Sequence, residues 1–254
     1  MRENMRGHLN QTIHIIQEHR SIRNFLDRPV EDHIIKEIIK SAQCMPSSIN
    51  GQQVSVIVIK NEETKQKVCD LSGNQPWIKE APVLLIFVMD FYKTHLAAQI
   101  NNTTQIIHES VEGTLVGSFD AGLAMGGAIV AAESLELGVV PIGGIRLNPK
   151  EMIELLHLPE YTYPLAALAL GYAKNVSRRK PRLPICTFKH MEEYNTKGLK
   201  ESIEKYDNLM ESYLKDIGRE QEVNWSVNTS NIYKDVYFPK VYPTMKDQKF
   251  LNDK

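Results

Sequence analysis

The chain has 254 residues, and its 30 lysines and arginines nearly cancel its 31 aspartates and glutamates, which gives a formal net charge of −1 at pH 7. This length allows one large domain or two small ones, and the balanced charge argues against a dedicated nucleic-acid or membrane-surface binder. The three cysteines lack CxxC spacing, so they indicate a reduced, cytoplasmic protein rather than a disulfide scaffold or a zinc site.

The N-terminal part of the chain alternates helices with two strands. Residues 1–11 have no apolar signal core, so nothing points to export. The spacing of apolar residues and two β-branched or apolar runs predict, in order, helices over about 9–18 and 32–45, a strand over 54–59, helices over 62–71 and 77–80, and a strand over 83–89. Asp32 is the predicted N-cap of the second helix. The last strand is apolar on both faces, which indicates a sheet covered by helices on both sides.

The stretch over 114–137 is long and apolar enough to require a choice between a membrane span and a core helix. It contains Asp120, Glu133 and Glu136, and a charge near the centre of a membrane span is costly. We therefore predict a deeply buried helix of a soluble protein. Gly138 is the predicted helix stop, because glycine is favoured just past a helix end.

The remaining segments complete the predicted order of elements. They predict a helical excursion with loops over 92–112, a strand over 139–145 interrupted by Pro141 and Gly143-Gly144, a helix over 149–156, a strand over 165–170, a basic loop to about 190 and a final amphipathic helix over 197–215. The tail from 225 has too weak a periodicity to assign. No segment before 190 resembles a linker, so we expect a single domain over 1–254 with a C-terminal extension from about 190.

A short cationic stretch near the start has the side chains of an anion site. His19, Arg20, Ser21 and Arg23 lie between a predicted helix and Pro29, which favours an extended or turn conformation. Side chains alternate sides in an extended segment, so His19, Ser21 and Arg23 share one side. Arginine forks and a hydroxyl suit a compact anion such as phosphate. On these residues alone, a solvated basic turn remains the alternative.

Three further clusters could meet the same ligand. The first offers hydroxyl and amide groups from Ser47, Ser48, Asn50 and Gln52. The second offers the backbone N–H groups of Gly143 and Gly144, which a flat ligand could approach closely because glycine has no side chain. The third offers cations from the basic segment 178–182, with Lys180 and Arg182. Each also has a purely structural interpretation, as a turn, a bulge and a proline-stiffened surface loop.

Several familiar signatures are absent from the sequence. It has no GxGxxG after the first strand, no Walker loop, no HExxH and no GxSxG. His108-Glu109 lacks a partner at metal-ligand spacing, so we expect a surface position and no metal site. Cys44 lies beside the serine loop, but no histidine is placed to activate it, and a buried, inert thiol is the expectation.

Five motifs, taken in order, resemble those of the flavin-dependent nitroreductase family. They are H-R-S-I-R at 19–23, S-S-x-x-x-Q at 47–52, G-x-Q at 73–75, I-G-G-x-R at 142–146 and K-P-R-L-P at 180–184. The resemblance covers about residues 12–225 and points to the NADPH-preferring branch of oxygen-insensitive nitroreductases and flavin reductases. It implies an α+β fold with a central, mostly antiparallel sheet flanked by helices, in an intertwined homodimer that binds FMN at its interface.

The resemblance also implies roles for particular residues. His19, Arg20, Ser21 and Arg23 would hold the FMN phosphate and ribityl chain, with positive charge added by Lys180 and Arg182. Ser47, Ser48 and Gln52 would come from the partner subunit, and Gln75 would meet the polar edge of the ring. Pro141, Ile142, Gly143 and Gly144 would lie beside the isoalloxazine ring, and the helix around 121–132 would pack in the dimer core.

Two positions depart from the family's pattern. Pro141 stands where the family usually has an aromatic residue, so one flavin contact is altered. The C-terminal extension would wrap the dimer or form the nucleotide loop, and the segment that would clamp NADPH offers Arg219 flanked by Glu220 and Glu222. We therefore expect NADPH to be preferred over NADH by a modest margin.

The activity implied is that of an FMN-dependent NAD(P)H oxidoreductase. FMN would carry the chemistry with no catalytic side chain, and nitroaromatics, quinones or free flavin would be reduced by a two-electron, ping-pong mechanism. Two alternatives remain from the sequence: a flavin-binding or sensing protein without turnover, and a non-redox protein that binds a phosphorylated metabolite. We expect a cytoplasmic homodimer with small aromatic acceptors and with no metal, nucleic-acid or membrane partner.

Overall fold

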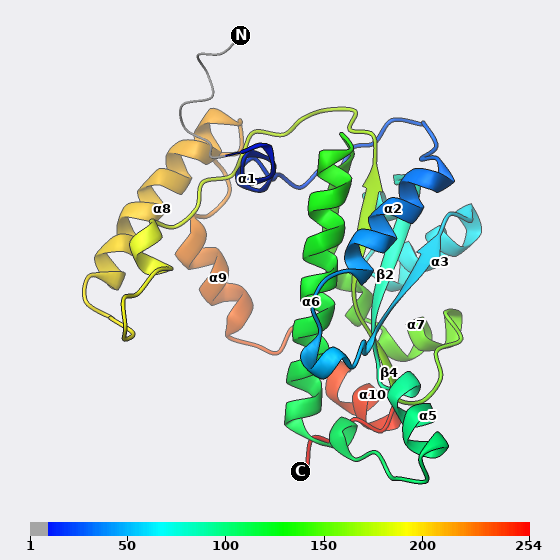
Figure 1. Ribbon diagram of the computed structural model, residues 1–254. Coiled ribbons are helices and arrows are strands. Elements are labelled where there is room, and N and C mark those ends of the chain that lie inside the picture. Colours follow the sequence, from blue (N-terminus) through cyan, green and yellow to red (C-terminus); the bar gives the residue numbers. More distant parts are fainter. Residues whose placement is uncertain (1–9) are drawn as a thin grey trace. The chain divides into compact units, whose positions relative to one another are not determined.

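The computed structural model describes residues 10–254 (Figure 1). Its strands are β1 (Val54–Ile59), β2 (Val83–Asp90), β3 (Gly138–Ile142) and β4 (Thr162–Gly171). Its α-helices are α1 (Gln11–Gln17), α2 (Asp32–Gln43), α3 (Glu62–Leu71), α4 (Pro76–Glu80), α5 (Tyr92–Ile100), α6 (Val111–Ser134), α7 (Pro149–Leu155), α8 (Leu199–Asp216), α9 (Trp225–Tyr233) and α10 (Val241–Asp247). Short 3₁₀ turns include η1 (Ser48–Asn50), η2 (Ile107–Glu109), η3 (Gly144–Arg146) and η4 (Ile185–Thr187).

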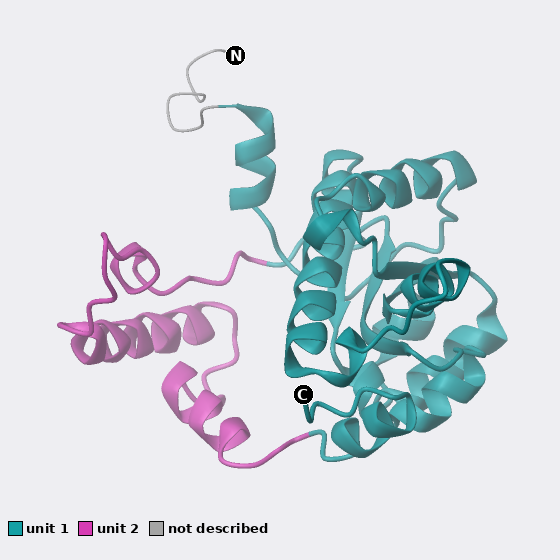
Figure 2. Cartoon of the chain, turned by 60° about the horizontal axis from the view of Figure 1, so that its bottom comes forward, with its two compact units in different colours: residues 1–177, 238–254 teal, residues 178–237 magenta. Residues whose placement is uncertain are grey.

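The chain divides into two compact units (Figure 2). Unit 1 comprises the chain up to Ser177 together with Phe238–Lys254, and unit 2 comprises Arg178–Tyr237. Unit 2 is therefore an insertion, because the chain leaves unit 1 after β4 and returns to it before α10.

The four strands of unit 1 form one antiparallel sheet in the order β1-β2-β4-β3. The two central strands pair over nearly their whole length, from Val83 opposite Leu170 to Asp90 opposite Thr162, with a register shift after Phe87. β3 lies at one edge and tolerates Pro141, since an edge strand can lack one N–H donor. This sheet confirms the predicted α+β class with a mostly antiparallel sheet.

Helices cover both faces of the sheet, as predicted from the apolar run over 83–89. One face packs against α2 and α6, and its buried residues include Leu85, Phe87 and Leu168. The other face packs against α3, α4 and α7, with Ile86 and Ala169 in its core. Apolar side chains alternate between the two cores along each central strand because neighbouring strand residues point to opposite faces.

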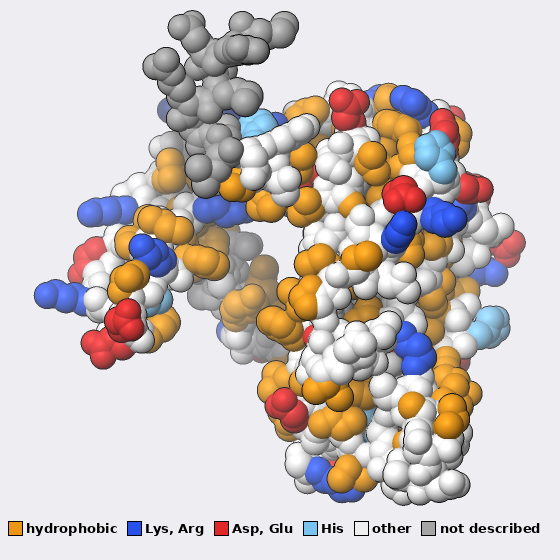
Figure 3. All heavy atoms as spheres, viewed as in Figure 1, with side chains coloured by type: hydrophobic (Ala, Val, Ile, Leu, Met, Phe, Trp, Pro, Cys, Tyr) orange, Lys and Arg blue, Asp and Glu red, His pale blue; other side chains and the backbone are white. Residues whose placement is uncertain are grey.

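The long helix α6 buries only one of its faces. Its buried residues are small or polar and recur every three or four positions, as in Gly117, Asp120, Ala124 and Ala128. By length and composition α6 could cross a membrane, but core helices of soluble proteins can be equally long and apolar. Of its most apolar 18-residue stretch, 33% is buried inside the protein. The prediction of a deeply buried helix therefore holds for one face. Phe119, on the other face, is 68% exposed, and apolar side chains gather along the helix (Figure 3).

Two predictions of helix ends are wrong. α6 ends at Ser134 with Leu135 as C-cap, and Glu136 takes the left-handed conformation (φ 62°) that we expected a glycine to provide. Gly138 instead begins β3, where a Cβ would stand 2.6 Å from Cγ1 of Ile22. Likewise Asp32 is the first residue of α2 rather than its N-cap, and its carboxylate pairs with Lys60.

Three further predictions about exposure and extent are corrected. Cys44 is exposed, because α2 ends at Gln43 and the thiol lies beyond the packed face. His108 is buried, at 4% exposure, because its ring packs edge-on against Tyr161. The amphipathic helix α8 is not the final helix, since α9 and α10 follow it in the tail that showed weak periodicity.

Unit 2 has a small core of its own. Tyr206, Met210 and Leu214, spaced four residues apart on α8, are buried against neighbours that include Leu183 and Trp225. The Tyr206 hydroxyl donates to the carbonyl of Pro181 at 2.9 Å, so the extended basic segment is fastened along α8.

Candidate functional site

The cationic stretch forms an extra, irregular edge beside β3. Ser21 forms a parallel bridge with Val139, and the N–H of Ile22 donates to the Val139 carbonyl at 2.8 Å. A few residues later the N–H of Leu26 donates to the carbonyl of Tyr172, just past the end of β4. Ile22 is buried, so the side chains on either side of it, Ser21 and Arg23, point away from the core as the alternation predicted.

The four predicted phosphate ligands have different surroundings. His19 Nδ1 lies 2.7 Å from the Glu133 carboxylate on α6, and Arg20 pairs at 2.7 Å with the carboxylate of Glu18. Both side chains are thus held in place by acids of unit 1. Arg23 has no ion pair among the residues that the structure describes, and its guanidinium lies over the ring of Trp77 at 5.4 Å. Arg23 is the cation of this set that remains available to an anion.

The glycine turn at the end of β3 lies against Gln75. A Cβ on Gly144 would stand 2.5 Å from Gln75 Nε2 and 2.8 Å from the carbonyl oxygen of Ser72, so no side chain fits there. Gln75 Nε2 donates to that carbonyl at 3.0 Å. The structure therefore brings together two predicted site residues that are far apart in sequence, and Pro141 is exposed at the same edge.

Trp77 links the two halves of this region and was missed in the sequence. It follows Gln75 by two residues, so α4 presents Gln75 to the glycine turn and Trp77 to Arg23. Its indole Nε1 is buried with no hydrogen-bond partner in the described part of the chain. Its position just after the G-x-Q motif was the feature of the sequence that could have marked Trp77 as a site residue. An unpaired buried donor is uncommon in folded proteins, so the indole N–H favours a ligand with an acceptor at this place.

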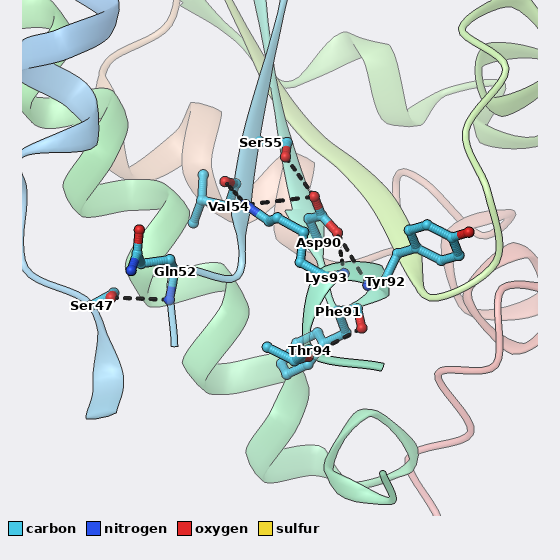
Figure 4. A network of polar contacts seen from close by, with 9 residues as sticks. All are labelled: Ser47, Gln52, Val54, Ser55, Asp90, Phe91, Tyr92, Lys93 and Thr94. Carbon is cyan, nitrogen blue, oxygen red and sulfur yellow. Dashed lines mark hydrogen bonds and ion pairs between the residues drawn. The ribbon is translucent and has the colours of Figure 1, made fainter. Parts of the chain in front are cut away.

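The serine loop before β1 has an unusual backbone. Ile49, Asn50 and Gln52 all have positive φ values of 49°, 56° and 52°, which is costly for residues other than glycine. The Ile49 side chain is 97% exposed. Ser47 Oγ accepts a hydrogen bond from the N–H of Gln52 at 3.2 Å (Figure 4). Strain of this kind persists only where the surroundings fix the conformation, and it is often found at binding sites.

Asp120 of α6 holds the serine loop in this conformation. In the sequence it served only as an argument against a membrane span. Its carboxylate accepts from the N–H of Ser48 at 3.1 Å and from Nε2 of Gln53 at 2.6 Å. A cavity of about 550 Å³ opens beside the loop, between α2, β1 and α6.

A second carboxylate organises the end of β2 (Figure 4). Asp90 accepts from Ser55 Oγ at 2.5 Å and from the N–H groups of Tyr92 and Lys93, where α5 begins. Lys93 Nζ donates to the carbonyl of Val54 at 2.8 Å. These groups form hydrogen bonds with one another, so the network stabilises the strand ends and is not a ligand-binding site.

The remaining predicted cations belong to unit 2. Lys180 and Arg182 are exposed and have no ion pair among residues 10–254, while their neighbour Arg178 pairs with Asp216 at 3.0 Å. Arg219 is half exposed and forms an ion pair with Glu222, one of the two acids that flank it in sequence.

Unit 1 thus defines a class of protein: an α+β fold that presents cationic and hydroxyl donors, a tryptophan and a side-chain-free glycine turn along one sheet edge. Two family models match the chain, the nitroreductase family over residues 16–172 and the nitroreductase family C-terminal domain over residues 180–253. The chain belongs to the nitroreductase family. The resemblance inferred from the five motifs is confirmed.

Individual relatives agree with this assignment. The FMN reductase (NAD(P)H) of Bacillus subtilis is 42% identical over 249 residues, covering 97% of this chain and 100% of the relative. The structure of B. megaterium NfrA2 has a TM-score of 0.95 at 45% identity, covering 97% of this chain and 100% of that one. The NADPH:FMN oxidoreductase of Vibrio harveyi, solved with NAD⁺, has a TM-score of 0.86 at 30% identity over 96% of this chain and 100% of its own.

Proposed function

We propose that the protein is an FMN-dependent NAD(P)H oxidoreductase that reduces nitroaromatics, quinones or free flavin. The main structural support is a pair of contacts made by one short segment. Trp77 lies under Arg23 of the cationic edge, and Gln75 lies against Gly144 of the glycine turn. Two of the relatives named above are an FMN reductase and an NADPH:FMN oxidoreductase, and this chain matches almost their whole length, which supports turnover and does not favour a non-catalytic flavin binder.

The residues present fit FMN. Ser21 and Arg23 offer a hydroxyl and an uncompensated guanidinium at the sheet edge, which suits a phosphate. Gln75 lies against the glycine turn with its amide held by the Ser72 carbonyl, which suits contact with the polar edge of a flat ring. The unpaired Trp77 Nε1 at the same place is a donor without an acceptor.

Each group then has a role in binding and orientation. Ser21 and Arg23 would hold the phosphate, with His19 and Arg20 kept in place by Glu133 and Glu18. Gln75 and the N–H groups of Gly143 and Gly144 would fix the polar edge of the ring, beside Ile142 and Pro141. Bound FMN would supply the redox chemistry, taking a hydride from NAD(P)H and passing two electrons to the acceptor. Nicotinamide and acceptor would use the pocket in turn.

We further propose that the functional form is a homodimer in the cytoplasm. The face of α6 that carries Leu115 and Phe119 is apolar and exposed, and exposed apolar patches often mark protein–protein interfaces. A second copy would also bring Ser47, Ser48 and Gln52 to the cofactor, which would give the strained loop a function. In unit 2, Lys180 and Arg182 would add positive charge and Arg219 would contact the nucleotide.

The test is flavin retention. The purified protein should be yellow, should bleach on anaerobic addition of NADPH, and should oxidise NADPH steadily when a quinone is present. Arg23→Ala should release FMN on dilution, because a charged hydrogen bond contributes about 1.5–3 kcal/mol. Arg28→Ala is the matched control, since Arg28 lies over Tyr172 at 3.8 Å in the same segment but is outside the predicted site.

The outcomes separate the alternatives. Equal flavin retention in Arg23→Ala and Arg28→Ala would remove the phosphate assignment. Bleaching without sustained turnover would indicate a flavin-binding protein that is not an enzyme, and a colourless protein that cannot be loaded with FMN would refute the proposal.

A further inference from the structure

Arg146 is the last residue of the I-G-G-x-R motif and has no role in the site described so far. It ends the 3₁₀ turn η3, whose middle residue Ile145 is fully buried and anchors the turn. Its Nη1 donates to the carbonyl of Leu165 on β4, and its guanidinium lies over the ring of Phe238 at 5.7 Å. The side chain is therefore held in one place by two different segments.

That place is beside Gly143. A Cβ on Gly143 would stand 3.1 Å from Arg146 Nη2 and 3.7 Å from its central carbon. The guanidinium thus occupies the space that a side chain at 143 would fill. Gln75 occupies the corresponding space at Gly144. A ligand seated on the two glycines would have an amide next to one of them and a positive charge next to the other.

The charge of Arg146 has no carboxylate counterion in the described part of the chain. Among residues 10–254, no carboxylate pairs with it, although the side chain is half-buried. Tyr163 is an ionisable neighbour that lines the same cavity of about 410 Å³. Burial raises the pKa of the Tyr163 phenol far above its ordinary value, so this group stays neutral and cannot balance the arginine. The Leu165 carbonyl and the Phe238 ring hold the guanidinium but do not neutralise its charge, so the site favours an anion.

We propose that Arg146 supplies the positive charge that favours the reduced over the oxidised cofactor at the glycine turn. This inference rests on the proposed function. A hydride brings two electrons and one proton, so the ring system gains one unit of negative charge when the nicotinamide becomes NAD(P)⁺. A fixed cation beside the ring stabilises that charge without reorganising, and it is more effective where water is excluded.

The role differs from that of the cations already assigned. Arg23 lies on the N-terminal edge segment and is assigned to the phosphate, whose charge is the same in both redox states. Such a residue strengthens binding of oxidised and reduced FMN alike. Arg146 lies at the other end of β3, against a glycine of the predicted ring contact, so its effect should be larger for the reduced state.

The experiment measures the two-electron midpoint potential of bound FMN in the holoprotein, together with the dissociation constant of oxidised FMN. Arg146→Gln should weaken reduced FMN at least tenfold relative to oxidised FMN, which is a fall of about 30 mV in potential. Arg146→Lys should recover most of the difference. Lys240→Gln is the matched control, because Lys240 is a cation two residues from Phe238 whose Nζ bonds Asn148 Oδ1 at 2.6 Å.

A purely structural role gives a different result. If Arg146 only fastens the turn to Leu165, the Gln and Lys variants will lose oxidised and reduced FMN equally and the potential will stay unchanged, which overturns the proposal. A shift in Lys240→Gln as large as in Arg146→Gln would overturn it too, since the effect would then not be specific to Arg146.

A second pair of variants leaves the arginine in place. Ser118 of α6 lines the same cavity as Arg146 and Tyr163. Ser118→Asp adds a carboxylate there and should lower the potential, whereas the isosteric Ser118→Asn should not. Equal potentials in these two variants would count against the proposal even if Arg146→Gln does not fold. A parent protein that binds no FMN would refute the proposed function itself, and an FMN-loaded protein with unchanged potentials would refute this inference alone.

Discussion

In the interior beside α6, Gln53 Nε2 donates a 2.6 Å hydrogen bond to Oδ2 of Asp120. Asp120 is 3% exposed and Gln53 equally so, and the same carboxylate receives the N–H of Ser48. One buried acid therefore fixes both ends of the strained serine loop to the long helix. This connection gives the loop its conformation before any ligand or second chain arrives.

Asp120→Ala should destabilise the fold by about 1–3 kcal/mol, because it leaves the Gln53 amide and the Ser48 N–H buried without an acceptor. Asp120→Asn should cost less, since it keeps one acceptor oxygen. Urea unfolding of the apoprotein measures both. We also expect Asp120→Ala to retain less FMN, because the loop carries Ser47 and Ser48. Unchanged stability in Asp120→Ala would show that water replaces the carboxylate.

Gly138→Ala should distort the cationic edge. Its Cβ would stand 2.6 Å from Cγ1 and 2.7 Å from Cβ of Ile22, the buried residue between Ser21 and Arg23. Overpacking of this kind costs about 1–3 kcal/mol. A double-mutant cycle with Ile22→Ala provides the control: truncating Ile22 should cost less in the Gly138→Ala background than in the parent. Additive effects in thermal unfolding would contradict a direct clash.

The stability of the fold should fall in mild acid because of His108. Burial of the ring lowers the pKa of His108 below its ordinary value, and the nearby Glu109 carboxylate opposes this only in part. As the pH falls, the unfolded chain binds a proton at about pH 6.5, before the folded chain does. The contribution of His108 is therefore complete above that pH and is lost as the pH falls through the folded pKa.

The measurement is the urea midpoint at pH 7.5 and at pH 5.5. His108→Gln should reduce the difference between the two midpoints, and His33→Gln, at an exposed position, should leave it as in the parent. A difference that persists unchanged in His108→Gln would assign the acid sensitivity to other groups.

Phe119→Glu should weaken the proposed dimer by placing a charge on the apolar face of α6. Sedimentation velocity at micromolar concentration should show a shift toward monomer, with a parallel loss of bound FMN. Ile100→Glu is the matched control, because Ile100 is 80% exposed but lies on α5. A variant that stays dimeric and keeps its flavin would place the interface elsewhere.

Nucleotide choice should depend on the ion pair between Arg219 and Glu222. Arg219→Ala should raise the KM for NADPH about five- to thirtyfold and leave that for NADH nearly unchanged, since one screened charge contact with the 2′-phosphate contributes about 1–2 kcal/mol. Glu222→Gln should lower the KM for NADPH by releasing the arginine. Equal changes for both nucleotides would show that Arg219 does not contact the phosphate.

Local patterns predicted much of the fold. The bounds predicted for β1 and α3 agree with the structure, because a β-branched run and an amphipathic helix between turn residues are signals carried by the segment itself. The order of five motifs was enough to identify the family. The alternation of the edge segment also placed Ser21 and Arg23 on the side away from the core.

Features that depend on distant contacts could not be read in this way. Gly138 is required by the side chain of Ile22, more than a hundred positions earlier, and not by the end of α6. His108 is buried because the chain around Tyr161 covers it. The pairing of Arg146 with Gly143 depends on the carbonyl of Leu165 and the ring of Phe238, neither of which the motif contains.

The division of the chain at Ser177 and Phe238 has a consequence for how such proteins can diversify. Both ends of unit 2 are attached to unit 1, at the end of β4 and just before α10, so the entropy of closing this loop is already a fixed cost of the fold. That cost grows only slowly with length, by about 0.6 kcal/mol for each doubling. Insertions and deletions within Arg178–Tyr237 therefore perturb the sheet very little. The segment proposed to select the nucleotide can change in length and sequence while the scaffold that holds the cofactor stays the same.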